Sequence, residues 1–402
     1  MSLTVTPVTG MPQVEAGDDL VAMISKALHD NGIQLVDGDV LVVSSKIASK
    51  ARGLFAEPRD RQSVIAGETE WVVAERRAPQ PSGEVRLTRV VKSVAGPVMA
   101  GAGVDASNTG AYEHLLLLPR DPDAVCRDLH AGLTAIHELQ RLGIVLSDTG
   151  GRAWRVGQTD FALGAHGVRV TDDLRGGVDA DGRPLEVTTR AVADEIAAAG
   201  DLVKGKVDGV PVAHLRGLGD LVVEGSARGP GSGARSLVRT GREDWFGLGQ
   251  VEAVRAALGV LPGSDLAATV GIASAAPETL AERATRAVAT AIHALPEVGV
   301  DVGPAPGPGP GPGSRTESRP GTGTGSGPWT GRGSGSETGR PRGQPRAASR
   351  TDARRLVVTA SDPFDVGMAT ARLLVAAWAE GLTASVVARA ELSVTLDLVD
   401  RP

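Results

Sequence analysis

The stretch GDVLVVSSKIASK (residues 38–50) sets the pattern for the first half of the chain. A Gly-Asp turn leads into a run of aliphatic and β-branched residues, which predicts a short strand. The strand passes into a segment that favours a helix, and Ser44, Ser45, Lys46 and Lys50 lie at and beyond this junction. Backbone amides and a lysine at such a junction can bind phosphate, while a solvated helix start explains the same residues equally well.

Further strands and helices are predicted on both sides of this stretch. The predicted strands are VRLTRVVKS (residues 85–93), IVLSDTG (144–150) and VPVAHLRG (210–217). The predicted helices are DDLVAMISKALHD (18–30) with Asp18 or Asp19 as N-cap, DAVCRDLHAGLTAIHELQRLG (123–143) closing at Gly143, and TTRAVADEIAAAGDLVKG (188–205) with Thr188 or Thr189 as cap. Residues 1–249 are therefore predicted to form a domain that mixes helices and strands in irregular order, without a clean βαβ alternation.

The remainder of the chain has two patterned flanks around a segment of low complexity. Residues 303–350 are Gly, Pro, Ser, Thr and Arg with almost no apolar side chains, so burial cannot offset the entropy of ordering them, and they are predicted to form a disordered linker. Residues 250–302 read as helices, and residues 351–402 read as strand, helix, strand, strand. The two flanks are predicted to form one small α/β domain.

Composition excludes several classes of protein. The formal net charge of -6 and the lack of a continuous basic run argue against nucleic acid as a partner. No stretch reaches the roughly 18 apolar residues of a membrane span, and the N-terminus has no basic and apolar leader segment. Because Cys126 is the only cysteine, no intramolecular disulfide can form. A cytoplasmic location is therefore expected.

Two separate segments combine aspartate with small polar residues after a predicted strand. AGAGVDASNTG (residues 100–110) contains Asp105, Ser107 and Asn108. VLSDTGGRAWRVGQTD (145–160) contains Asp148, Thr149, Arg152 and Arg155. A carboxylate followed by a hydroxyl at a strand end can bridge two Mg²⁺ or Mn²⁺ ions, although turns and caps favour the same residue types.

Two nucleotide-binding patterns are present in incomplete form. GAGVDA (residues 101–106) has the spacing of a dinucleotide fingerprint, but the residues that follow do not open an amphipathic helix. GDLVKGKV (200–207) approaches a P-loop, but Val207 stands where a Mg²⁺-binding Ser or Thr is required, and a helix precedes it instead of a strand. Neither pattern alone is specific.

In combination, seven ordered segments closely resemble the coenzyme F420-0:L-glutamate ligase family, over about residues 5–248. They are VTGMPQVEAGDDL, GDVLVVSSKIASKARG, AGAGVDASNTG, LLLPRDPDA, SDTGGRAWRVGQTDFALGAHG, ADEIAAAGDLVKGKVDGVPVAHLRG and GSGARSLVRTGREDWF. The resemblance implies a two-subdomain α+β fold, an intertwined homodimer, and GTP-dependent γ-glutamyl addition of L-glutamate to F420-0, a deazaflavin coenzyme. The implied cofactors are two Mg²⁺ or Mn²⁺ ions, with K⁺ as a candidate further ion.

The resemblance also implies roles for individual residues. Asp105, Asp148 and Thr149 match positions that bind the divalent metals. The positions that match GTP contacts are Met11, Pro12, Gln13, Val14, Ser45, Lys50 and Asn108, with Gly231 and Ser232 in a second nucleotide-proximal loop. Gln13 stands where family members often have Glu, so the charge of this contact differs. Arg152 or Arg155 is expected to offset further phosphate charge.

The implied reaction needs no nucleophilic side chain, because a substrate carboxylate attacks GTP and the resulting acyl phosphate is taken up by the glutamate amine. The C-terminal portion does not resemble the flavin-binding domain found in some relatives, so no FMN is expected. Three alternatives fit parts of the sequence: a metal-dependent phosphohydrolase acting on a nucleotide or phosphorylated cofactor, an NAD-type dehydrogenase built on GAGVDA, and a scaffold that docks partners through the Pro/Gly segment.

Overall fold

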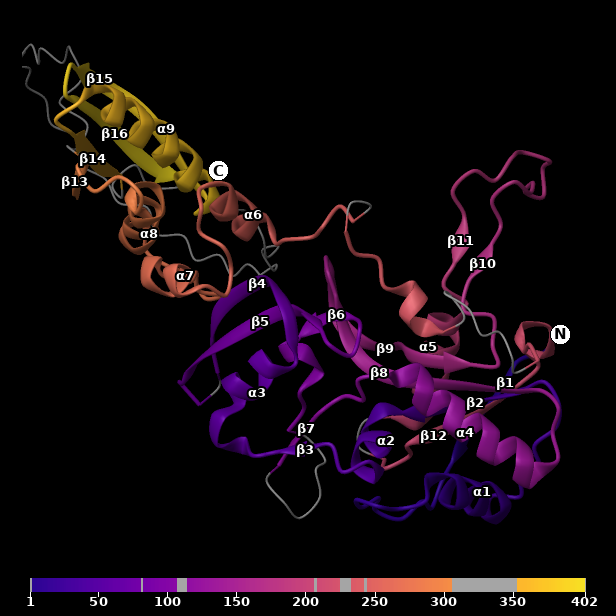
Figure 1. Cartoon of the computed structure of the whole chain (residues 1–402). Helices are drawn as coiled ribbons and strands as arrows, with labels where there is room; N and C mark the ends of the chain where they lie inside the picture. Colours follow the sequence, from indigo (N-terminus) through magenta and orange to yellow (C-terminus); the bar gives the residue numbers. More distant parts are fainter. Residues whose placement is uncertain are drawn as a thin grey trace, which may run out of the picture. The chain divides into compact units, whose positions relative to one another are not determined.

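The computed structural model describes residues 2–80, 82–106, 114–205, 208–224, 233–241, 244–305 and 353–401. The chain forms two compact units, which Figure 1 shows together. The first comprises Met1–Ala253, Leu261–Ala268 and Ser274–Ala276, and the second comprises Val254–Val260, Thr269–Ala273 and Pro277–Pro402. The chain therefore passes between the units several times, whereas the sequence predicted a single boundary at residue 249.

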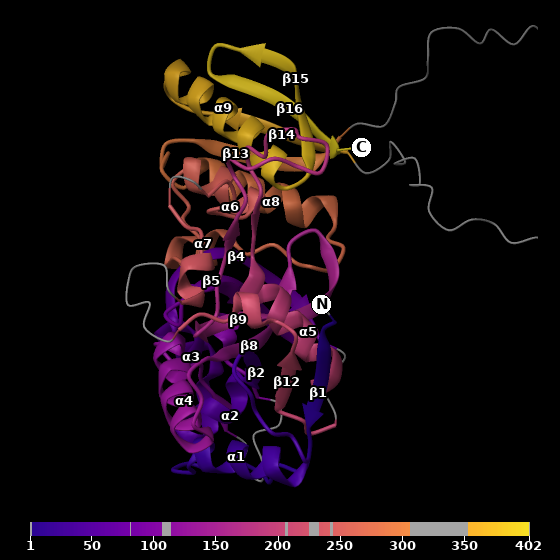
Figure 2. The same cartoon turned by 90° about the vertical axis from the view of Figure 1, so that its right-hand side faces the viewer.

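A five-stranded mixed sheet forms the centre of the first unit (Figure 2). Its order is β1 (Thr4–Val8), β12 (Val212–Arg216), β2 (Asp39–Ser44), β8 (Leu142–Arg152) and β9 (Arg155–His166). β2 and β8 are parallel, and the other neighbours are antiparallel. The central position of β2 explains its uninterrupted apolar run, because helices cover both faces of the sheet there.

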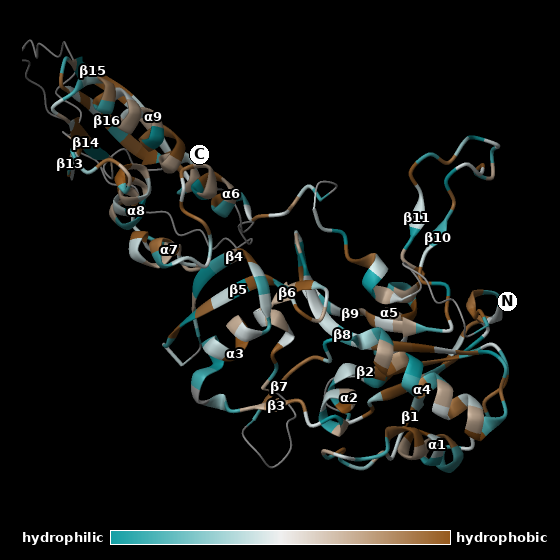
Figure 3. Cartoon of the chain, viewed as in Figure 1, coloured by the Kyte–Doolittle hydropathy of each residue, from teal (hydrophilic) through white to brown (hydrophobic). Residues whose placement is uncertain are grey.

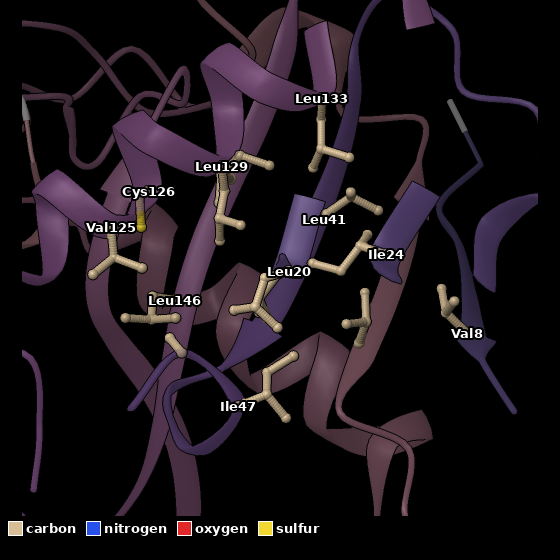
Figure 4. Close-up of a cluster of buried hydrophobic side chains, with 14 of the residues drawn as sticks. Val8, Leu20, Ile24, Leu41, Ile47, Val125, Cys126, Leu129, Leu133 and Leu146 are labelled. Atoms are coloured by element: carbon tan, nitrogen blue, oxygen red, sulfur yellow. The ribbon is translucent and has the colours of Figure 1, made fainter. Parts of the chain in front are cut away.

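Helices pack against the sheet on both sides. Leu41 and Val43 face the core shared with α1 (Leu20–Asp30), α2 (Ser45–Ala51) and α4 (Pro122–His137), whereas Val40 and Val42 face α5 (Val192–Lys204). Figure 4 shows the first of these cores, and Figure 3 shows polar and apolar residues side by side on α4, as expected of a helix with one buried face. The mixed composition agrees with the predicted α+β class.

The helix limits differ from the predicted ones at two places. Asp19 caps α1 as predicted, by accepting a hydrogen bond from the Ala22 amide. α4 ends at His137 because Glu138 adopts the left-handed conformation, so the predicted end at Gly143 is wrong and Gly143 lies in β8. α5 begins at Val192 without a side-chain cap, and Thr189 lies in a short strand instead.

A smaller antiparallel sheet lies beside the central one in the first unit. It contains β4 (Thr69–Pro79), β5 (Val85–Ser93) and β6 (Val98–Ala100). The helix α3 (Arg61–Gly67) packs against this sheet, and the two form a small hydrophobic core of their own. The remaining short elements are β3 (Phe55–Ala56), η1 (Pro58–Asp60), η2 (Gly101–Gly103), β7 (Leu115–Leu116), β10 (Asp172–Asp173), β11 (Thr189–Arg190), η3 (Gly219–Leu221) and η4 (Ala234–Leu237). GAGVDA follows β6, which belongs to an antiparallel sheet, so it does not form the parallel β-turn-α unit of a dinucleotide fold.

The second unit is a four-stranded antiparallel sheet with helices α8 (Leu280–Ile292) and α9 (Pro363–Ala379) in its core. The strand order is β13 (Gly299–Pro304), β14 (Arg354–Thr359), β16 (Ser393–Asp400) and β15 (Leu382–Ala390). Gly303 and Pro304 pair with β14, so the predicted linker begins too early, and its residues 306–350 lie outside the described residues. α6 (Gln250–Ala257) and α7 (Asp265–Val270) each span both units.

No helix in the described ranges is both long and apolar enough to span a bilayer.

We expect Gly200→Ala to destabilise the first unit, although alanine in a helix interior is more stable than glycine by about 1 kcal/mol. A Cβ at Gly200 would lie 2.8 Å from Cβ of Val42, which is fully buried on the central strand β2 and cannot move aside. Overpacking of this kind costs about 1–3 kcal/mol, so the urea midpoint should fall. Gly67→Ala is the matched control, because a Cβ there meets no atom within 4 Å. Equal midpoints for both variants would contradict this account.

Candidate active site

A pocket of about 630 Å³ opens at the C-terminal end of strand β2 and beside the middle of strand β8. Because these strands are parallel and Ser44 pairs with Ser147, the residues that follow β2 lie beside Asp148 and Thr149 of β8. The loop after β1, the C-terminal end of α5 and the segment before β12 complete the walls. The lining residues are Met11, Pro12, Gln13, Val14, Ser44, Lys46, Ile47, Lys50, Ser147, Asp148, Thr149, Asp160, Asp201, Lys204, Gly205, Gly209, Val210 and Pro211. We call this the carboxylate-lysine pocket.

Most of the predicted site residues line this pocket: Met11, Pro12, Gln13, Val14, Lys50, Asp148 and Thr149. Ser45 and Asp105 do not line it but contact residues that do. Ser45 Oγ donates a hydrogen bond to Asp148 Oδ1 at 3.1 Å, and the Asp105 carboxylate lies 2.5 Å from Lys46 Nζ. Asn108, Gly231 and Ser232 lie outside the described residues. Arg152 and Arg155 do not line the pocket, so the structure gives no support to their predicted phosphate role.

Lys50 brings a buried positive charge to the pocket wall. Its side chain is 6% exposed, and none of the described carboxylates forms an ion pair with it. Burial lowers the pKa of the Lys50 ammonium, and the nearby charge of Lys46 lowers it further. A buried ammonium without an acidic partner is stabilised by a bound anion, so this part of the pocket favours an anionic group of a ligand.

Asp148 has a shifted pKa as well, and the shift is opposite in direction to that of Lys50. Burial raises the pKa of its carboxyl to about 6, and the charges of Asp160 and Asp105 add to this effect, against the opposing hydrogen bonds from Ser45 and the Thr149 amide. Asp148 and Thr149 lie within strand β8, which agrees with the strand predicted over residues 144–150. A rigid strand holds the carboxylate in place, which suits a ligand position better than a flexible loop does.

A buried network beside Asp148 was missed by the sequence interpretation. Lys204 Nζ lies 2.6 Å from Asp160 Oδ2 and donates to Ser147 Oγ at 2.6 Å. Thr149 Oγ1 donates to Asp160 Oδ1 at 2.7 Å. Burial alone would raise the pKa of Asp160, but the charge and hydrogen bond of Lys204 outweigh burial and hold it below its usual value. The sequence feature that could have indicated it is GDLVKG (residues 200–205), which ends helix α5 and places Lys204 and Gly205 on the pocket wall.

The carboxylate and hydroxyl oxygens at this end of the pocket are the type of ligand that a hard divalent cation prefers. Among the described residues, no group of three His, Cys, Asp or Glu side chains is arranged to hold a metal ion. Lys46 and Lys204 neutralise Asp105 and Asp160, whereas Asp148 has no cationic partner in the described part of the chain. The negative charges of neighbouring carboxylates repel one another, and this repulsion raises the pKa of one of them. A bound Mg²⁺ or Mn²⁺ ion would relieve the repulsion.

The family model of F420-0:Gamma-glutamyl ligase matches residues 10–217, which is just over half of the chain. The chain belongs to the F420-0:gamma-glutamyl ligase family. The resemblance found in the sequence is thereby confirmed. All residues that line the carboxylate-lysine pocket fall within the matched range, and the whole of the second unit lies beyond it.

Relatives of this ligase family match little more than half of the chain. The coenzyme F420:L-glutamate ligase of Archaeoglobus fulgidus is 39% identical over 239 residues, which is 56% of this chain and 92% of the relative. That of Halobacterium salinarum is 39% identical over 225 residues, 52% of this chain and 85% of the relative. That of Natronomonas pharaonis is 36% identical over 225 residues, 52% of this chain and 84% of the relative. Each relative is therefore matched over most of its own length.

Proposed function

We propose that this protein uses GTP to attach L-glutamate to coenzyme F420-0 through a γ-linked amide bond. The observation that carries this proposal is one pocket whose lining residues have opposite charge requirements. Buried Lys50 requires an anion, and Asp148 requires a cation. A nucleotide with its divalent metal ions satisfies both, since phosphate oxygens bind the ammonium and the metal binds the carboxylate.

The residues of the pocket divide into two roles. We propose that Met11, Pro12, Gln13 and Val14 contact GTP beside Lys50, with Ser45 holding Asp148 in orientation through its hydroxyl. Asp148, Asp105 and Thr149 would hold two Mg²⁺ or Mn²⁺ ions, and K⁺ is a candidate further ion. The metal would neutralise phosphate charge and align the γ-phosphoryl group for transfer.

The proposed reaction has two steps. The carboxylate of F420-0 attacks the γ-phosphorus of GTP in line, which gives an acyl phosphate and GDP. The amine of L-glutamate then attacks the acyl carbon, phosphate leaves and the amine gives up a proton. The chain contributes positioning and charge, and no side chain forms a covalent intermediate. Cys126 agrees with this, because burial in the core raises the pKa of its thiol and keeps it protonated.

Mass spectrometry of F420-0 incubated with the protein, GTP, L-glutamate and Mg²⁺ or Mn²⁺ tests the proposal. The expected products carry one or more added glutamyl residues, with one GDP formed for each. Release of phosphate from GTP at the same rate without glutamate, and with F420-0 unchanged, would instead indicate a phosphohydrolase. Light scattering tests the homodimer that the family resemblance implies, and the absorbance spectrum of the purified protein tests the expected lack of FMN.

A further inference from the structure

A second pocket, of about 290 Å³, lies along the same hairpin as the carboxylate-lysine pocket. Asp148 and Thr149 line the first pocket, and the next residues of β8, Gly150, Gly151 and Arg152, line the second. At about 3.3 Å per residue in an extended strand, Gly151 lies roughly 10 Å along the chain from Asp148. This separation is short enough for one elongated ligand to reach from one pocket to the other.

The walls of the second pocket are mainly apolar. They include Pro97, Met99, Phe161, Leu237 and Val238. The Phe161 ring packs close over Gly150, because a Cβ at Gly150 would lie 3.1 Å from that ring. Two adjacent glycines leave the strand backbone uncovered by side chains, so a flat group can approach it closely.

Charged side chains stand at the rim of this apolar hollow. Arg152 and Arg239 are exposed, and within the described ranges neither forms an ion pair. Arg235 donates a hydrogen bond to the Val94 carbonyl at 2.8 Å and is fixed in place. Asp194 accepts a hydrogen bond from the Ala162 amide at 2.9 Å and is the one acidic residue of the lining. Burial raises the pKa of the Asp194 carboxyl. We call this the arginine-rimmed pocket.

Asp123 holds one wall of this pocket in place. Its Oδ1 accepts hydrogen bonds from the amides of Ala165 on β9 and Ala234 on η4, each at 2.9 Å. The segment that carries Arg235, Leu237 and Arg239 is thereby fixed against the edge of the central sheet. The pocket is thus built on ordered elements rather than on a free loop.

We propose that the arginine-rimmed pocket binds the planar ring of the acceptor, and that the anionic chain of the acceptor runs along β8 to bring its carboxylate to the carboxylate-lysine pocket. This inference rests on the proposed function. Apolar walls around two glycines fit a flat ring such as a deazaflavin, and Asp194 can accept a hydrogen bond from a ring N–H. Arg152 and Arg239 fit the anionic groups of the chain. Free glutamate, which has no apolar part of this size, fits these walls less well.

Fluorescence titration with coenzyme F420-0 tests this inference on the full chain with two variants. Gly151→Val fills the hollow, and it should fold because a Cβ at Gly151 meets no atom within 4 Å. Arg239→Ala removes an exposed charge at the rim. Each should raise the Kd for F420-0 about tenfold or more, because Arg239→Ala removes a charge-assisted contact and Gly151→Val removes space for the ring. The Kd for GTP and the KM for glutamate should stay within about twofold.

Arg183→Ala is the matched control, since Arg183 is exposed and lines neither pocket. Unchanged F420-0 affinity in Gly151→Val and Arg239→Ala, with GTP-dependent glutamate addition intact, would overturn the inference and leave the proposed function standing. A rise confined to the KM for glutamate would place the amino donor in this pocket and overturn it as well. Wild-type protein that binds neither GTP nor F420-0 would refute the proposed function and, with it, this inference.

Discussion

Asp148→Asn should lower the rate of GTP-dependent glutamate addition by at least about 100-fold while the protein stays folded. The amide keeps the shape of the side chain and can still accept the hydrogen bond from Ser45, but it brings no negative charge to a divalent cation. The rate should be measured at saturating Mg²⁺ or Mn²⁺, because weak metal binding is otherwise confused with lost chemistry. Asp220→Asn, on an exposed residue that does not line the pocket, is the matched control.

The same variant should be more stable than the wild type when metal is removed with a chelator. The folded-state pKa of Asp148 is raised to about 6, so ionisation in the fold is unfavourable. Below the unfolded-state value of about 4 both states are protonated and no penalty exists. As pH rises through 4 to 6 the unfolded state loses its proton first and the wild type loses stability, after which the penalty is constant.

With allowance for screening at a partly exposed site, the gain of Asp148→Asn at pH 8 should be about 1–2 kcal/mol and should vanish near pH 4. Urea unfolding of both proteins at the two pH values measures it. Retention of most wild-type turnover, or a lower stability at pH 8 than at pH 4 relative to the wild type, would refute the place given to Asp148.

The elements of the fold that depend on local pattern were predictable. The run DVLVV gave β2, the alternation in VRLTRVVKS gave β5, and Asp19 gave the start of α1. The C-terminal end of α4 and the start of α5 were not predictable, because Glu138 in a left-handed conformation and an uncapped α5 carry no distinct sequence signal. β13 was missed because its strand pairing with β14 spans the long low-complexity segment.

The candidate site was predictable as a list but not as a geometry. The family motifs pointed to Asp148, Thr149 and Lys50, and the structure brings all three to one pocket. No pattern indicated that Lys46 pairs with Asp105 or that Lys204 pairs with Asp160, since each contact joins residues far apart in sequence. Tertiary contacts of this kind pair Asp105 and Asp160 with lysines, and they leave Asp148 without an ion pair among the residues that the structure describes.

Lys204→Met should destabilise the first unit by about 3–5 kcal/mol, the cost of leaving one member of a buried ion pair without its partner. Lys204 and Asp160 side chains are 5% and 4% exposed, and Lys204 also donates to Ser147. Without the ammonium, Asp160 keeps its hydrogen bonds from Ser147 and Thr149 but loses the charge that holds its pKa low. Urea unfolding at pH 7, following a probe in the first unit, gives the loss directly.

A double variant separates the effect of the two charges from the effect of side-chain packing. Lys204→Met combined with Asp160→Asn removes both charges, so it should recover more than half of the lost stability, because no buried charge is then left unpaired. Lys26→Met is the surface comparison, because Lys26 and Asp30 form the same kind of lysine–aspartate pair on an exposed helix face. Their side chains are 73% and 50% exposed, and the loss should be below about 1 kcal/mol. High salt should abolish the small Lys26 effect and leave the Lys204 effect nearly unchanged, since solvent ions screen only exposed charges. Equal losses at the two lysines would mean that the network beside Asp148 does not hold strand β8 and helix α5 together as the structure indicates.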